Sequence, residues 1–270
     1  HKVSHAYIFN GEAGSGKRLL ADAFAMTLQC ERGGTQACMQ CRSCRQAMSG
    51  NQPDIIHVTH EKPGTIGVED IRSQVNADIA IKPYRSPYKI YIVGEADKMT
   101  VQAQNAILKT MEEPPSYAVL MLLADNADRM LPTILSRCVR LNLKAVKDRL
   151  IKEYLMKKMK IPDYQADLSI TFAQGNVGKA IKLASSDKFQ EMKEEAIKLL
   201  GYMDGMELHD MPEAVKKIGE YKDNIQELLD LFTLWFRDVL LFKATQEAGE
   251  LIFKDELAAV RKQAKKSSYE

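Results

Sequence analysis

A glycine-rich segment near the start of the chain has the pattern of a phosphate-binding loop. The residues that match G-x-x-x-x-G-K are Gly11, Gly14, Gly16 and Lys17. In such a loop, backbone N–H groups and the lysine ammonium surround phosphate oxygens. An apolar run over residues 6–10 precedes it and a helical pattern over 17–28 follows, which is the context that the motif requires. We therefore expect a nucleotide-type phosphate cradle here.

Two positions that would normally hold Mg²⁺ have changed. Arg18 stands where a Ser or Thr hydroxyl should contact the metal, and a guanidinium has no lone pair to donate. The apolar strand over residues 90–93 ends in Gly94-Glu95, without the metal-holding Asp, and Asp97 lies two residues beyond. We expect no ATP hydrolysis at this site. ATP or ADP binding without turnover stays open, because the cradle itself is kept.

Four of the five cysteines form a compact cluster within an irregular insertion. They are Cys30, Cys38, Cys41 and Cys44, with spacing C-x7-C-x2-C-x2-C. Four thiolates can close a tetrahedral, structural Zn²⁺ site. An iron–sulfur centre is an alternative, although its fourth cysteine usually lies just downstream, and unmetallated thiols are another. Cys138 stands apart and is expected to be a small buried apolar residue.

The elements that would position these residues alternate along the first half of the chain. Strands are predicted at 6–10, 55–58, 90–93, 119–123 and 139–143, and helices at 17–28, 68–79, 101–111 and 131–136. Strands that alternate with helices indicate an α/β layer with a mostly parallel sheet. After Lys144 only helices are predicted, at 146–159, 164–173, 177–184, 189–202, 211–221 and 224–244.

The change at Lys144 and a break near residues 185–187 predict three domains. They are an α/β phosphate-loop domain over 1–144 with the cysteine insertion at 30–44, a small helical domain over 145–186, and a helical domain over 187–270. The net charge of +2 excludes a strongly polybasic binder. No apolar run approaches the ~20 residues that span a bilayer, and no signal-peptide core is evident, so a cytoplasmic protein is expected.

Several segments together resemble the gamma/tau and delta-prime clamp-loader ATPases of the AAA+ class. These are residues 4–7 before the glycine loop, the four cysteines after its helix, Ile-Lys-Pro-Tyr at 81–84, the run at 105–115 that ends Glu-Glu-Pro-Pro, and Ser-Arg-Cys at 136–138. The resemblance is close over roughly residues 4–185. It implies an AAA+ domain, a helical lid and a helical collar that joins five subunits in a ring. It also implies that further segments precede residue 1 and follow Glu270.

Departures from the family pattern indicate its non-hydrolysing, delta-prime-like branch. The resemblance implies that the motor subunits keep Ser or Thr at the position of Arg18 and Asp-Glu at Gly94-Glu95. It also implies a nucleotide-sensing arginine where this chain has Gly178-Lys179. The expected partners are gamma/tau and delta subunits and, through the complex, a sliding clamp and primer–template DNA. The chain would be an accessory subunit of the DNA polymerase III holoenzyme and not an ATPase by itself.

The resemblance assigns one catalytic contribution, in trans, to Arg137 within Ser136-Arg137-Cys138. In related ATPases such an arginine reaches the γ-phosphate bound by a neighbouring subunit and stabilises the transition-state charge. A guanidinium suits this role because it is always charged and binds phosphate oxygens as a fork. The alternative is an ordinary surface arginine paired with a carboxylate.

These expectations together describe a stator, a rigid subunit of the ring that supplies Arg137 but does not hydrolyse ATP. Two other functions compete with this interpretation. One is an active gamma/tau-like ATPase with a relaxed Mg²⁺ site, which Arg18 and Gly94 argue against. The other is a zinc-dependent DNA-binding module, for which Arg42 and Arg45 are the main basic residues of the cysteine segment. Turnover of ATP by the isolated chain would favour the first, and tight DNA binding by the isolated chain would favour the second.

Overall fold

The computed structural model describes residues 3–60, 62, 64–203 and 211–266. The chain forms two compact units, and passes from the first to the second between Lys144 and Ala145. The three-domain division expected from the sequence stays a prediction.

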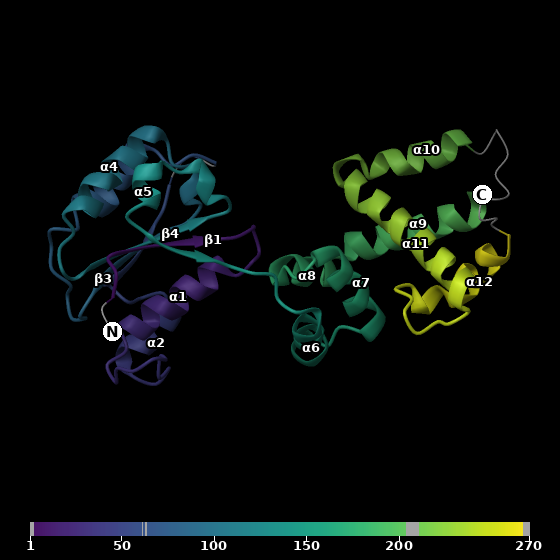
Figure 1. Ribbon diagram of the computed structural model, residues 1–270, viewed down its shortest axis with the longest axis horizontal. Helices are drawn as coiled ribbons and strands as arrows, with labels where there is room; N and C mark the ends of the chain where they lie inside the picture. The colour runs from purple at the N-terminus through teal and green to yellow at the C-terminus, as the bar shows by residue number, and fades with distance from the viewer. Residues whose placement is uncertain (1–2, 61, 63, 204–210, 267–270) are drawn as a thin grey trace. The chain divides into compact units, whose positions relative to one another are not determined.

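The centre of the first unit is a five-stranded parallel sheet (Figure 1). Its strands are β1 (Ala6–Asn10), β2 (Ile55–Val58), β3 (Lys89–Val93), β4 (Ala118–Ala124) and β5 (Val139–Asn142), in the order β2-β3-β4-β1-β5. Every residue of β3 and β4 is buried, as expected for continuous apolar strands covered on both faces. The predicted α/β class with a parallel sheet is confirmed.

Helices cover both faces of this sheet. They are α1 (Lys17–Leu28), α2 (Arg42–Met48), α3 (Val68–Ile71), α4 (Val101–Glu112) and α5 (Pro132–Leu135), with a π-helical turn at Arg72–Asn76 and 3-10 turns at Ala96–Lys98 and Ala127–Arg129. Ala21 and Ala25 of α1 pack against one face. Ile107 of α4 and Ile134 of α5 pack against the other (Figure 1).

Local signals set the limits of α4, which carries two residues used below. Thr100 caps its start, because the Thr100 hydroxyl accepts a hydrogen bond from the Ala103 N–H at 3.2 Å. Pro114 and Pro115 lie just beyond its end, where proline cannot continue a helix. Glu112 is therefore the last residue of a helix whose inner face is fixed in the core.

Helices make up the second unit. They are α6 (Asp148–Met159), α7 (Asp163–Ala173), α8 (Val177–Ala184), α9 (Asp187–Met203), α10 (Met211–Glu220), α11 (Ile225–Thr245) and α12 (Leu257–Lys266), with 3-10 turns at Lys222–Asn224 and Lys254–Glu256. One apolar core is formed by α6, α7 and α8. A second surrounds Trp235 of α11, which is fully buried and donates its indole N–H to Gln263 at 2.6 Å.

The turn between α7 and α8 requires glycine. Gly175 has φ +83°, and a Cβ there would lie 2.6 Å from the Cβ of Ala145. Asn176 then caps α8, since its side-chain oxygen accepts from the Lys179 N–H at 3.0 Å. Within the described residues, no helix is long and apolar enough to span a membrane.

Candidate functional site

The glycine loop has the backbone of a phosphate cradle. It runs directly from β1 into α1, and Gly14 (φ 85°) and Gly16 (φ 93°) occupy the left-handed region that favours glycine. Gly16 stands immediately before Lys17, the first residue of α1. The first turn of that helix therefore points free N–H groups toward the loop, as anion binding requires.

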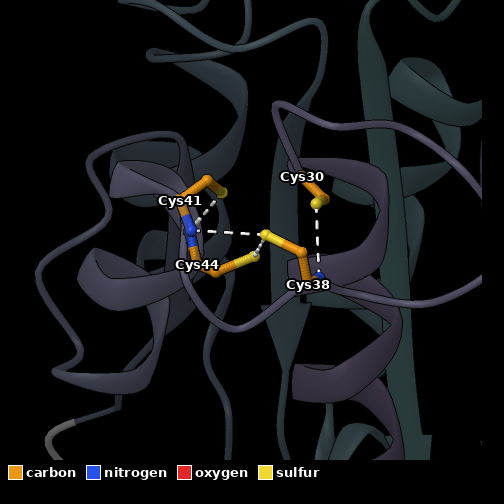
Figure 2. A group of neighbouring side chains, drawn as sticks. All are labelled: Cys30, Cys38, Cys41 and Cys44. Atoms are coloured by element: carbon orange, nitrogen blue, oxygen red, sulfur yellow. Dashed lines mark hydrogen bonds between the residues drawn. The ribbon is translucent and has the colours of Figure 1, made fainter.

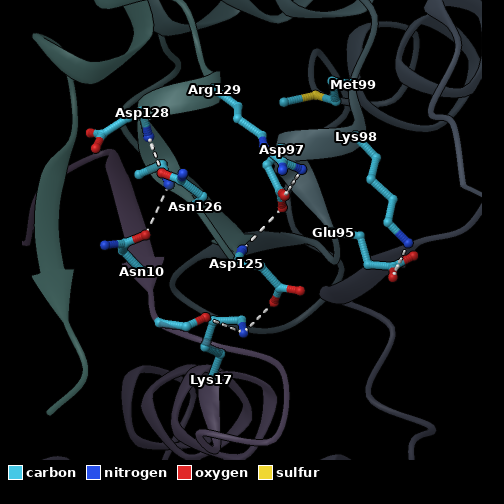
Figure 3. Close-up of polar contacts among 12 residues, drawn as sticks. Asn10, Lys17, Glu95, Asp97, Lys98, Met99, Asp125, Asn126, Asp128 and Arg129 are labelled. Carbon is cyan, nitrogen blue, oxygen red and sulfur yellow. Dashed lines mark hydrogen bonds and ion pairs between the residues drawn. The ribbon is translucent and has the colours of Figure 1, made fainter. Parts of the chain in front are cut away.

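The Lys17 ammonium is already fully engaged within the protein. It donates to the carbonyls of Gly11 at 2.6 Å and Glu12 at 2.9 Å, and to a carboxylate oxygen of Asp125 at 2.7 Å (Figure 3). These three acceptors match its three N–H donors. Asp125 follows β4 directly and was not anticipated from the sequence. A bound phosphate would have to replace this carboxylate.

The residue after Lys17 faces an acidic partner of its own. Arg18 lies on the first turn of α1 and donates to Asp22 at 3.1 Å, one helical turn along. Asp22 also lies 3.7 Å from the His57 ring. Burial, followed by the charge of Arg18, lowers the pKa of His57. This arrangement places a guanidinium where the motif calls for a metal-binding hydroxyl.

The carboxylates that follow β3 are both engaged by other residues of the chain. Gly94 follows the strand, and Glu95 forms ion pairs with Lys98 and with His60, the latter at 3.5 Å. The hydrogen bond from Lys98, with a smaller contribution from His60, lowers the pKa of Glu95. Asp97 accepts the Asp125 N–H at 3.0 Å, and its side chain is only 4% exposed (Figure 3). Asp97 therefore anchors the segment after β4.

The four clustered cysteines meet at one point. Each sulfur lies within 4.8 Å of the others (Figure 2). Three of the sulfurs accept hydrogen bonds from backbone N–H groups within the cluster. The N–H of Cys38 donates to the sulfur of Cys30 at 3.4 Å, that of Cys41 to the sulfur of Cys38 at 3.3 Å, and that of Cys44 to the sulfur of Cys41 at 3.4 Å. Cys41 also caps α2. The sequence prediction that these side chains form one group thus agrees with the geometry, and the group could hold a metal ion.

The electrostatics of the cluster differ from one sulfur to the next. The N–H groups of Gln40 and Cys41 lower the pKa of Cys38 to about 6. Burial raises the pKa of Cys44 to about 12. The pKa of Cys41 is lowered as well, although burial opposes the shift. Thiolates, not thiols, bind metals, so the backbone N–H groups favour the metal-binding form at Cys38 and Cys41, and burial opposes it at Cys44. Four sulfur donors suit a soft cation.

Arg137 lies two residues after the end of α5 and is held by two acceptors. One guanidinium nitrogen donates to the carbonyl of Thr133 at 3.0 Å, and the other donates to Glu112 at 3.0 Å. The side chain of Arg137 is 36% exposed. Ser136 beside it is exposed and donates its hydroxyl to the Thr133 carbonyl at 3.1 Å. Burial raises the pKa of Cys138 to about 12, as for an unreactive thiol.

These sites define an α/β P-loop domain in which the positions that normally hold Mg²⁺ carry Arg18 and Gly94. The chain matches the protein family described as "DNA polymerase III, delta subunit" over residues 1–147. It therefore belongs to that family, and the resemblance to clamp-loader subunits that was identified from the sequence is confirmed.

The similarity extends to named relatives in several bacteria. The DNA polymerase III subunit delta' of Bacillus subtilis is 30% identical, over 99% of this chain and 80% of its own length. The subunit tau of the same organism is 27% identical, over 90% of this chain and 46% of its own length. The subunit delta' of Pseudomonas aeruginosa is 37% identical, over 51% of this chain and 42% of its own length.

Proposed function

We propose that this chain is the non-hydrolysing stator of a clamp-loader ring and supplies Arg137 to the ATP site of a neighbouring subunit. The observation that carries the proposal is the coexistence of a partly exposed Ser-Arg-Cys arginine with a metal site that lacks its usual ligands, because Arg18 and Gly94 stand at their positions. The subunit can thus complete a partner's site without turning over ATP in its own.

Electrostatics support the absence of hydrolysis. In P-loop enzymes, Mg²⁺ bridges the β- and γ-phosphates and neutralises the developing charge. Arg18 has no lone pair for the cation, and the carboxylate of Glu95 is occupied by Lys98 and His60. Lys17 is the side chain of the loop that would bind phosphate, and its charge is neutralised by Asp125. Nucleotide binding here would be weak and without turnover.

The partly exposed side chain of Arg137 suits the transition state of phosphoryl transfer. Negative charge spreads over the γ-phosphate oxygens as the bond to the leaving group breaks. In well-studied NTPases, an arginine from a neighbouring protein or domain stabilises this charge and raises the rate of hydrolysis by roughly 10³–10⁵-fold. Arg137 follows a short helix at the edge of the domain, where it can reach a neighbour. No nucleophile, base or activated water is needed from this chain.

The cysteine cluster is proposed to hold structural Zn²⁺. Cys30, Cys38, Cys41 and Cys44 supply four sulfurs, which fill a tetrahedral shell and leave no position for substrate. The metal would tie the segment after α1 to the start of α2. Its contribution is rigidity in the unit that presents Arg137.

The proposed partners are the gamma/tau and delta subunits of a hetero-oligomeric ring. Through that assembly, the chain would act on a sliding clamp and primer–template DNA in the cytoplasm. Similarity to both delta' and tau subunits supports the choice of ring partners. DNA contact would come through the complex.

The decisive experiment measures ATP hydrolysis with and without the arginine. Arg137→Ala should leave the chain folded and lower the steady-state ATPase rate of a reconstituted complex with gamma/tau subunits, by at least several-fold because one shared site loses its trans charge. Arg137→Lys keeps the charge without the fork and should recover only part of the rate. An unchanged rate with Arg137→Ala refutes the proposal. Turnover by the isolated chain that disappears with Lys17→Ala would instead identify a motor subunit.

A further inference from the structure

Two elements that are distant in sequence hold the guanidinium of Arg137. Glu112 is the last residue of α4, and Thr133 belongs to α5. The contact with Glu112 spans 25 residues of sequence, and the contact with Thr133 is local, four residues back. Because the acceptors engage both terminal nitrogens, they fix the plane of the guanidinium as well as its position.

Both supports are anchored in the same core. Met111, the residue before Glu112, is 2% exposed, and Ile134, the residue after Thr133, is fully buried. The two belong to one apolar cluster beneath α4 and α5. The carboxylate of Glu112 and the carbonyl of Thr133 are therefore presented from backbone that packing holds still.

The two contacts leave most of the guanidinium available. Arginine has five N–H donors, and the two hydrogen bonds of Arg137 use one on each terminal nitrogen. The side chain is 36% exposed, so part of it is in contact with solvent. A phosphate from outside the chain can meet a guanidinium that is already oriented and still has a fork of donors to offer.

We propose that Glu112 is a positioning residue for Arg137, and this rests on the proposed trans role of that arginine. Glu112 fixes the direction in which the guanidinium meets the neighbour's γ-phosphate. A flexible arginine would lose side-chain freedom when it engages the phosphate. Glu112 imposes that order in advance, so the rate of the chemical step benefits.

The effect of Glu112 is one of geometry more than of stability. Its side chain is 54% exposed, and such surface ion pairs contribute little to folding. Glu112→Ala should therefore fold normally. The neighbouring Glu113 is also exposed and makes no described contact with Arg137, so Glu113→Ala removes the same charge at the same helix end and is a matched control.

The kinetic test uses the reconstituted complex with gamma/tau subunits. Glu112→Ala should lower kcat for ATP hydrolysis by about three- to tenfold, less than the roughly 100-fold that a full 1 Å misplacement can cost, because the contact with Thr133 remains. It should leave KM for ATP unchanged. Glu112→Gln keeps an acceptor oxygen and should restore most of kcat. Glu113→Ala should match the unmodified protein. An unchanged kcat with Glu112→Ala, or an increased one, overturns the inference.

A second readout does not depend on catalysis. The side-chain Nε–H signal of Arg137 in the free chain, followed by ¹⁵N NMR relaxation, should show restricted motion in the unmodified protein and in Glu113→Ala. In Glu112→Ala, the same signal should show that the Arg137 side chain moves more freely. Equal mobility of Arg137 in the unmodified protein, Glu113→Ala and Glu112→Ala overturns the inference. If Arg137→Ala lowers the rate and Glu112→Ala does not, only the positioning role falls. If Arg137→Ala itself has no effect, the trans role falls too.

Discussion

At the scale of single residues, Lys17 carries the strongest conflict between motif and structure. A lysine that should meet phosphate is 11% exposed and bonded to Asp125. The phosphate loop therefore keeps its shape while a carboxylate from the end of β4 takes the place of the ligand. Nucleotide affinity should then depend on the acid at the end of β4.

Replacement of that acid gives a direct test. Asp125→Ala should strengthen binding of ATP to the free chain by about fivefold at low salt, because an ion pair worth ~1 kcal/mol no longer has to be broken and a negative charge leaves the phosphate site. Isothermal titration calorimetry measures the change. Asp128→Ala, at an exposed acid paired with Arg140 and not with Lys17, is the control. Equal affinities for the two variants would mean that Lys17 is free to bind phosphate already.

The sequence indicated the motif residues but not the residues that restrain them. Glycine and lysine spacing identified the loop, and cysteine spacing identified the cluster. Asp125 lies 108 residues from Lys17, and Glu112 lies 25 from Arg137. Glu112 stands in the run that ends Glu-Glu-Pro-Pro, but no sequence pattern pairs it with Arg137, or Asp125 with Lys17, because each is brought to its partner by the end of a strand or a helix. Only the packed sheet reveals them.

At the scale of elements, Asp54 organises the segment that precedes β3. It is 2% exposed and accepts N–H groups from Tyr84 at 2.6 Å, Ser86 at 3.0 Å and Arg85 at 3.1 Å. Burial by itself would raise the pKa of Asp54, but the three N–H donors outweigh it and lower the pKa below its usual range. The ionised form thus fixes residues 84–86 ahead of the strand.

The consequence for stability has a definite sign. The pKa of Asp54 is lower in the folded state than the value of about 3.9 expected for an unfolded chain. Ionised Asp54 therefore stabilises the folded state above that pH, and this stabilisation is lost as the pH falls through the pKa of the folded state. Asp54→Asn should lower the free energy of unfolding by about 1–3 kcal/mol at pH 7, because an amide cannot satisfy all three donors. Urea unfolding at several pH values measures this. A difference that stays constant into the acid range would show that charge is not involved.

Element prediction succeeded where periodicity was strong and failed where it was weak. The parallel strands and α1 agree closely with the predicted ranges. The helix predicted over 68–79 is instead α3 followed by a π-helical turn, since hydrophobic spacing does not distinguish the two hydrogen-bond patterns. The last helix, α12, was missed. Its buried residues are Val260, Gln263 and Ala264, and a stripe that includes a polar residue and an alanine gives little signal.

At the scale of the whole molecule, each unit has apolar cores of its own. The sheet unit has one on each face, and the helical unit has one on α6–α8 and one around Trp235. The fold class was predictable because strands alternate with helices up to Lys144 and then cease. The division near residue 186 stays a prediction, since the segments on both sides of it are helical and amphipathic.

Separate cores make metal removal a selective perturbation. Scanning calorimetry of the whole chain should show two transitions, and a strong chelator should lower the one that belongs to the sheet unit by more than about 5 °C, since structural metal binding contributes directly to folding. Cys38→Ser should lower the same transition without chelator. Cys138 lies outside the cluster, so Cys138→Ser should respond to the chelator as the unmodified protein does. A chelator-insensitive pair of transitions would exclude a structural metal.

The order of the strands also determines when the protein can fold during its synthesis. β1 precedes the other four strands of the sheet in the chain, yet it lies between β4 and β5, and Ala6 pairs with Leu120. At about 5–20 residues per second, the ribosome needs roughly 6–23 s to supply that partner. Throughout this interval an apolar strand has no neighbour to pair with, and β2 and β3 cannot provide one. The nascent chain should therefore depend on chaperone protection until β4 leaves the ribosome.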